Sequence, residues 1–168
     1  MLYYSIVLYF WRPWTAGSPP SDAITGRDYR GVSYIVEAYA PDYGLFIGQA
    51  LTNQQQVNIS ALHVLCSQNK DKLAWFPINY NSVVNQVLTG TINPVVGGLN
   101  VKDDILYIGR YVDVNLGTVH FGSICQEYHH LHYYHNNKVY TQSYYEILIV
   151  DGRCTQKRLK LETIDFNG

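Results

Sequence analysis

Apolar positions along the chain either alternate with polar ones or form short continuous runs, and this pattern predicts strands. Such runs occupy residues 2–10, 32–40, 45–51, 57–66, 105–112, 118–124, 139–150 and 158–166. Turn-forming residues separate several of them, as at residues 41–44 and 151–152. Residues 83–88 have a spacing that fits either a helical turn or a short strand, and no convincing amphipathic stripe occurs elsewhere. The pattern predicts an all-β fold.

One sequence motif occurs twice. The clearer copy runs from Pro94 through the turn at Gly98 to Tyr107, and a weaker copy runs from Pro20 through Gly26 to Tyr34. Further positions match in the same order: Trp11 with Trp75, Gly48 with Gly117, and residues 63–65 with 146–149. A repeat of roughly 70 residues is too long for a solenoid unit and short for an independent domain, so we expect one body with pseudo-twofold symmetry and a shared core.

The repetition divides the chain into five segments. These are an N-terminal strand (1–10), a first repeat (11–66), a connector (67–74), a second repeat (75–150) and a C-terminal extension strand (151–168). A chain of 168 residues is long enough to bury a sizeable core as one domain.

Composition narrows the function classes. Charged residues make up 15 % and the net charge is −1, so the chain lacks the basic surface that nucleic-acid binding requires. Its 16 tyrosines fit β-structure or, alternatively, a binding surface rich in rings and hydroxyls. Three cysteines without a Cys-x-x-Cys pair indicate neither a disulfide scaffold nor a zinc site.

The first ten residues are apolar but lack a basic start, and no small-residue cleavage site follows them. Ten residues are also too few to span a bilayer. We therefore expect no signal peptide and no membrane span, and a protein that is cytoplasmic or released by a non-standard route.

The order of these features resembles the DM-nine (DM9) tandem repeat. The residues that carry the resemblance are Trp75, Pro94, residues 95–98, 107–110, 117–120 and 145–148. It covers residues 11–150 and is closer in the second copy. It implies a prism-like all-β body in which two pseudo-twofold related repeats exchange strands. Characterised members include mannose-binding lectins of invertebrate innate immunity, often dimers, so it also implies carbohydrate binding, in recognition or defence, by a homodimer.

In those lectins an acidic residue after the glycine turn and a lysine after the next strand's glycine hold the sugar. The resemblance carries the acidic position to Asp28 and Asn100, and the lysine position to Gln49 and Thr118. Without the lysines, charge-assisted hydrogen bonds to the sugar are lost. We expect the first site to bind with altered preference and the second not to bind mannose. The alternative is a non-catalytic interaction or structural protein with an eroded sugar site.

Four histidines gather in residues 129–135, where the chain is longer than the family pattern and a loop or hairpin tip is expected. On a strand His130 and His132 would share one face and be candidate ligands for zinc or copper, with Glu127 or His120 as a third. The alternative is an exposed loop whose histidines respond to pH. Acidic residues are sparse and no nucleophile or phosphate-binding motif occurs, so we expect no enzyme and no cofactor.

Overall fold

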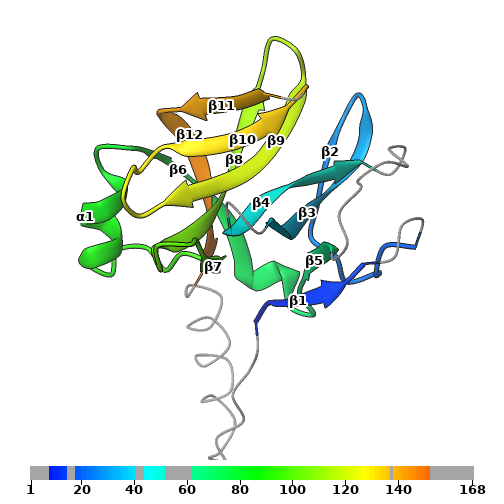
Figure 1. Cartoon of the computed structure of the whole chain (residues 1–168), viewed down its shortest axis with the longest axis horizontal. Coiled ribbons are helices and arrows are strands. Elements are labelled where there is room, and N and C mark those ends of the chain that lie inside the picture. Colours follow the sequence, from blue (N-terminus) through cyan, green and yellow to red (C-terminus); the bar gives the residue numbers. More distant parts are fainter. Residues whose placement is uncertain (1–7, 15–17, 41–43, 52–61, 137, 152–168) are drawn as a thin grey trace, which may run out of the picture.

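The structure is a computed structural model that describes residues 8–14, 18–40, 44–51, 62–136 and 138–151, and most of these lie in two antiparallel sheets (Figure 1). The first sheet has five strands: β1 (Phe10–Pro13), β2 (Thr25–Asp28), β3 (Gly31–Ala40), β4 (Gly44–Leu51) and β5 (Leu62–Cys66). The second has seven: β6 (Leu73–Asn79), β7 (Val96–Leu99), β8 (Ile105–Asp113), β9 (Thr118–Cys125), β10 (Leu131–His135), β11 (Lys138–Gln142) and β12 (Tyr144–Val150). The all-β prediction is confirmed.

The two sheets have the same topology. In the first, β3 pairs with β2, β4 and β5, and β1 pairs with β5. In the second, β8 pairs with β7, β9 and β12, and β6 pairs with β12. The strands β1 to β5 therefore correspond in order to β6, β7, β8, β9 and β12. The second sheet adds the hairpin β10–β11 after β9, and the helix α1 (Val83–Leu88) after β6.

Strand register matches the two halves residue by residue. Trp11 lies opposite Leu65, and Trp75 lies opposite Leu148. Acidic and basic side chains meet at equivalent places with their strands exchanged: Glu37 on β3 contacts His63 on β5, and Arg110 on β8 pairs with Glu146 on β12. The two halves therefore match in strand order and in register.

Strand register also changes two of the residue matches that the sequence predicted between the two copies. The counterpart of Pro94 is Ala23 rather than Pro20, because Ala23 bridges Cys66 at the place where Pro94 bridges Ile149. The counterpart of Gly48 is Gly122 rather than Gly117, since each lies opposite the equivalent residue of the central strand, Val36 or Gly109.

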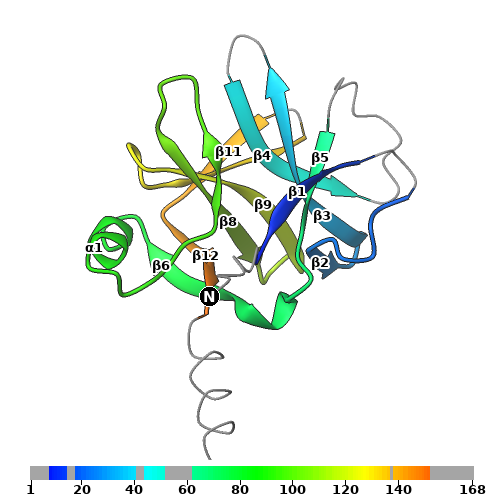
Figure 2. The same cartoon turned by 90° about the horizontal axis from the view of Figure 1, so that it is seen from below.

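The halves share one core, in which β4 lies against β9 (Figure 2). Its buried members come from both halves: Ile24, Ile35, Ile47 and Leu65 from the first, and Val95, Leu106, Ile108, Phe121, Cys125 and Leu148 from the second. Two glycines at corresponding strand positions leave room for core side chains of the opposite half. A Cβ on Gly26 would lie 2.6 Å from the Phe121 ring, and one on Gly97 would lie 2.1 Å from Ile47 Cδ1. The contacts are reciprocal, as a pseudo-twofold relation requires.

Several predicted segments have different boundaries in the structure. The long strand expected at 139–150 is two strands, β11 and β12, separated at Ser143. The loop or hairpin tip expected at residues 129–135 is a loop only at 129–130, because β10 begins at Leu131 and forms a hairpin with β11 while also pairing with β9. Residues 83–88 form a helix. The C-terminal extension strand, most of the N-terminal strand and the dimer contacts expected from them lie outside the described residues.

Strand exchange between the repeats is not found among the described residues. Every ladder joins strands of the same half, and an isolated bridge between Gly44 and Asn100 crosses from one half to the other. The halves are joined by this bridge, by the shared core and by the contacts described next.

Candidate functional site

The carboxylate of Asp28, predicted to accept sugar hydroxyls, is buried between the two halves. Its side chain is 1 % exposed. Oδ2 accepts hydrogen bonds from Arg30 Nη2 at 2.6 Å and from the backbone N–H of Val119, on β9, at 2.9 Å. Oδ1 accepts the backbone N–H of Arg30 at 2.8 Å. Asp28 is therefore occupied by protein donors and presents no open face to a sugar.

The charges of Asp28 and Arg30 stabilise the contact between the two halves. Burial by itself would raise the pKa of Asp28, but hydrogen bonds from Arg30 and the Val119 amide outweigh it and lower the pKa to about 2. Arg30 Nη2 in turn donates to the carbonyl oxygen of Val119 at 2.8 Å. Asp28 and Arg30 together bond both backbone groups of one β9 residue.

Gln49, the second residue of the predicted first site, contacts the same strand. Its Oε1 accepts the backbone N–H of Phe121 at 3.1 Å. β9 pairs with β10 only from Gly122 to Ile124, so Val119 and Phe121 lie beyond the paired stretch. Asp28 and Gln49, which the resemblance grouped as a sugar site, both bond backbone groups of β9, at a strand edge of the second half. They satisfy backbone groups that would otherwise be unpaired in a buried position.

The residues of the predicted second site do not meet. Asn100 is held by its own turn, where Oδ1 accepts the N–H groups of Lys102 and Asp104, and Nδ2 reaches Cys125 Sγ at the end of β9. Thr118 stands at the start of β9, roughly 20 Å away along the strand. Strand register also makes Ser123, not Thr118, the counterpart of Gln49.

The histidines proposed as metal ligands are engaged in local contacts. His130 stacks on Tyr80 with ring centroids 4.5 Å apart, and its Nδ1 lies 2.7 Å from the carbonyl oxygen of Tyr128. Burial lowers the pKa of His132. Among the described residues, the group of three candidate ligand atoms within 4.8 Å of one another is Asp104, Cys125 and Glu127, without either histidine. Asn100 and Lys102 already bond its carboxylates.

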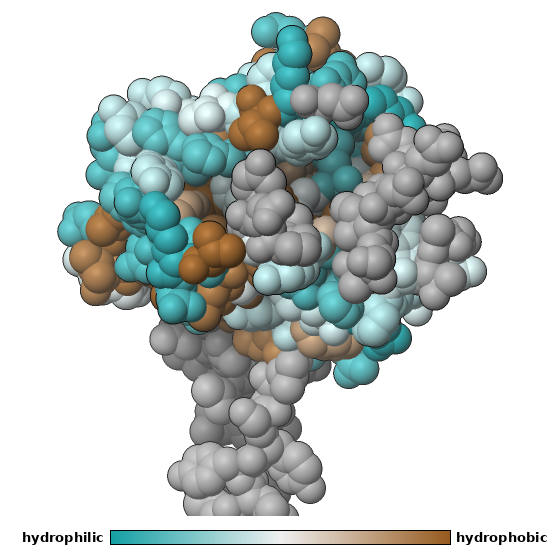
Figure 3. Space-filling view, viewed as in Figure 1, coloured by the Kyte–Doolittle hydropathy of each residue, from teal (hydrophilic) through white to brown (hydrophobic). Residues whose placement is uncertain are grey.

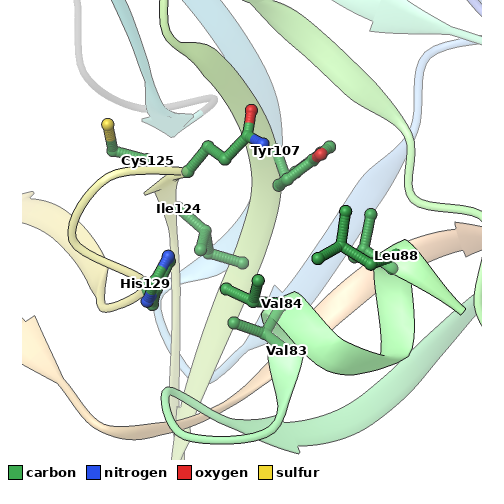
Figure 4. Close-up of a pocket in the computed structure, with 9 residues that line it drawn as sticks. Val83, Val84, Leu88, Tyr107, Ile124, Cys125 and His129 are labelled. Carbon is green, nitrogen blue, oxygen red and sulfur yellow. The ribbon is translucent and has the colours of Figure 1, made fainter.

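A pocket lies between α1 and the second sheet (Figure 4). Val83, Val84 and Leu88 approach it from the helix, and Tyr107 and Ile124 from strands β8 and β9. The free volume inside is about 20 Å³, which holds about one water molecule. Apolar side chains gather over α1 on the outer surface as well (Figure 3), where Leu88 is 75 % exposed. The pocket is too small for an organic ligand.

The groove between β8 and β12 is the site with room and suitable chemistry. These strands pair only at Arg110–Glu146 and Gly109–Ile147, and beyond Arg110 they diverge. Asn79, Tyr111, Val112 and Tyr144 are among the residues that line the resulting open groove, with the Arg110–Glu146 pair at its base. We call this the β8–β12 groove.

The polar base of the β8–β12 groove is held in place from two sides. Arg110 Nε donates to Glu146 Oε2 at 2.5 Å, and the guanidinium lies over the Trp75 ring at 4.5 Å from its centroid. Both side chains remain about a quarter exposed, so each keeps hydrogen-bonding capacity toward solvent. Tyr144, at the rim, is 75 % exposed.

The sequence did not predict the residues of the β8–β12 groove as site residues. Several of them nevertheless lie in the segments that carried the family resemblance, which are Trp75, residues 107–110 and residues 145–148. The available signal was the pairing of an Arg and a Glu at matched repeat positions, which the first repeat fills with Glu37 and His63. Recognising it requires the strand register.

No family model matches the chain, and no curated protein matches it. The DM9 resemblance therefore stays a prediction. Among the described residues no helix is both long and apolar enough to cross a membrane.

Proposed function

We propose that the protein is a non-catalytic carbohydrate-binding protein whose sugar site is the β8–β12 groove. The observation that carries the proposal is a fixed Arg110–Glu146 pair at the base of an open groove with the exposed ring of Tyr144 at its rim. The DM9 resemblance supports the same ligand class but places the site elsewhere.

Sugars present two kinds of surface, and the β8–β12 groove offers a partner for each. Vicinal hydroxyls bind well to a carboxylate that accepts two hydrogen bonds and to a guanidinium that donates them. The C–H face of a pyranose packs on an aromatic ring, which Tyr144 supplies. Trp75 and Glu146 fix the guanidinium in advance, so little side-chain entropy is lost when a sugar binds.

A glycan array with the purified full-length protein, followed by calorimetry on the best ligand, tests the proposal. Glu146→Gln keeps the shape but removes the charged acceptor, and should weaken binding by about tenfold or more, the typical worth of a charge-assisted hydrogen bond. Tyr144→Ala should weaken it similarly. The matched control is Tyr134→Ala, since Tyr134 is another exposed tyrosine (59 %) and lies on β10 outside the groove.

Two results would count against this function. If no glycan binds the unaltered protein, the groove is not a sugar site. If a glycan binds and the three variants bind it equally well, the sugar lies elsewhere. The second candidate is an interaction protein, favoured by the apolar tip of the β8–β9 hairpin, where Val114 and Leu116 are exposed. Under that function Leu116→Ser would reduce partner binding and leave the glycan array negative.

A further inference from the structure

The second sheet has two outer strands, β6 and β11, and the free edge of β6 is blunted. The carbonyl oxygen of Leu148 accepts the N–H of Val95 at 2.9 Å, so Leu148 faces away from β6. Backbone direction alternates along a strand, so the neighbouring Ile147 faces β6 and pairs with Phe76. The next residue of β6, Pro77, therefore faces outward. Its missing N–H removes a donor from this edge, as prolines do on the edge strands of natural sheets.

The edge of β11, the outermost strand in Figure 1, has no such proline. The backbone oxygen of His132 on β10 faces β9, since it lies 2.0 Å from where a Cβ on Gly122 would stand. By the same alternation, Tyr140 on β11 faces β10 while Val139 and Thr141 face outward. Among the residues that the structure describes, neither Val139 nor Thr141 has a backbone partner on this side.

The outward groups of β11 are complementary to those of a second copy of the same strand. When two β11 strands run antiparallel around a two-fold axis at Tyr140, Val139 lies opposite the partner's Thr141, and Thr141 lies opposite the partner's Val139. Residues placed in this way exchange both of their backbone hydrogen bonds. The arrangement therefore satisfies the outward donors and acceptors of both residues at once.

Side chains along the edge fit the same arrangement. Tyr140 is 39 % exposed and ends a row of stacked rings, in which its centroid lies 5.5 Å from that of Tyr133, and Tyr133 lies 4.7 Å from His120. On the two-fold axis the two Tyr140 side chains would be direct neighbours, in the type of pair where side chains come closest. Lys138, the charged residue of β11, would lie opposite the partner's Gln142, so no like charges meet.

We propose that the chain forms an isologous homodimer in which two β11 strands pair antiparallel around Tyr140 and join the second sheets of both copies. A net charge of −1 gives little repulsion between the copies. This contact differs from the dimer contacts that the sequence suggested, which fall on the terminal segments. One strand pair is a small interface, so we expect a reversible dimer with a Kd above about 1 μM.

Sedimentation equilibrium of the full-length protein, over concentrations that span the Kd, tests the proposal. We expect a reversible monomer–dimer equilibrium. Thr141→Pro removes an outward N–H and leaves the β10–β11 ladder intact, so it should raise the Kd by about tenfold or more. The matched control is Val114→Ser at the exposed tip of the β8–β9 hairpin, which should leave the Kd unchanged.

Two charge variants test the position of the two-fold axis. Tyr140→Lys and Tyr140→Glu each place like charges directly opposite one another in a homodimer, so each variant alone should remain monomeric. An equimolar mixture of the two variants should associate, because opposite charges then face each other across the axis. A contact with an unrelated extended segment, or with another surface of the chain, would not restore association in the mixture.

Thermal unfolding shows which variants are folded, and if Thr141→Pro is not, the Tyr140 variants decide the question. A protein that stays monomeric up to about 1 mM would overturn the proposal. So would a dimer that Val114→Ser weakens and the β11 variants do not. Glycan binding is measured separately and involves residues outside β11, so failure of one proposal does not imply failure of the other.

Discussion

At the scale of single residues, Asp28 shows how environment assigns a role to a side chain. A carboxylate after a glycine turn is suited to bind a sugar if it is exposed. Here Arg30 and the Val119 amide surround it, so its hydrogen bonds stabilise the contact between the halves.

We predict that Asp28→Asn destabilises the protein by about 3 kcal/mol, because truncating one partner of a buried ion pair leaves the other charge uncompensated. Glycan binding at 25 °C should persist while the variant remains folded. Urea unfolding of both proteins measures the effect. Asp103→Asn is the control, since Asp103 is exposed in a turn, and should change stability by less than about 0.5 kcal/mol.

The same carboxylate predicts a pH dependence. The pKa of Asp28 is about 2 in the folded protein against an ordinary value of 3.8, so its ionised form is favoured by folding. This contribution, about 2 kcal/mol, is present above pH 3.8 and is lost as the pH falls toward 2. The stability difference between unaltered protein and Asp28→Asn should therefore narrow between pH 5 and pH 2. A stability difference that stays constant between pH 5 and pH 2 would contradict the low pKa assigned to Asp28.

At the scale of elements, Gly48 and Gly122 occupy equivalent positions with different surroundings. Gly122 lies on β9 beside β10, and a Cβ there would sit 2.0 Å from the backbone oxygen of His132. A Cβ on Gly48 would meet nothing within 4 Å. The added hairpin β10–β11 accounts for the difference, since it covers β9 at the equivalent place.

We predict that Gly122→Ala destabilises the protein by about 3 kcal/mol or more, since a backbone atom cannot move aside by a change of rotamer. Gly48→Ala should be neutral or stabilising by up to about 1 kcal/mol, because it restricts the unfolded chain without a clash. Thermal unfolding of the two variants checks the pair. Equal losses of stability would show that glycine is needed at this repeat position for another reason.

At the scale of the whole molecule, the halves depend on each other. The core that contains Ile35 and Leu65 of the first sheet also contains Ile108 and Phe121 of the second. Separation would expose these side chains and leave Val119 and Phe121 without their partners from the first half.

We therefore expect chains divided within the 3-10 helix η1 (Lys70–Lys72) to be unfolded separately and to regain β-structure when mixed. Circular dichroism of each fragment and of the mixture measures this. Cooperative unfolding of either fragment alone would show that one sheet has a sufficient core of its own.

The sequence by itself determined the all-β fold class, because alternation of apolar residues is a local feature that sets strands. The duplication, marked by a tryptophan before each copy and a glycine turn, stays a prediction that the matching strand order of the two halves supports. The family resemblance, rather than local pattern, grouped Asp28 with Gln49, and in the structure these residues lie on β2 and β4, which both pair with β3. Asp28 and Asn100, which the resemblance matched with each other, also stand at equivalent places in the strand registers of the two halves.

Only the tertiary structure decided what those residues contact. Asp28 accepts a hydrogen bond from Val119, which lies ninety-one positions later in the chain. The sequence around either residue does not indicate that the two are in contact. The β8–β12 groove exists because two strands diverge beyond a single ion pair. Packing between distant segments determines whether a carboxylate or imidazole is buried, paired or available to a ligand.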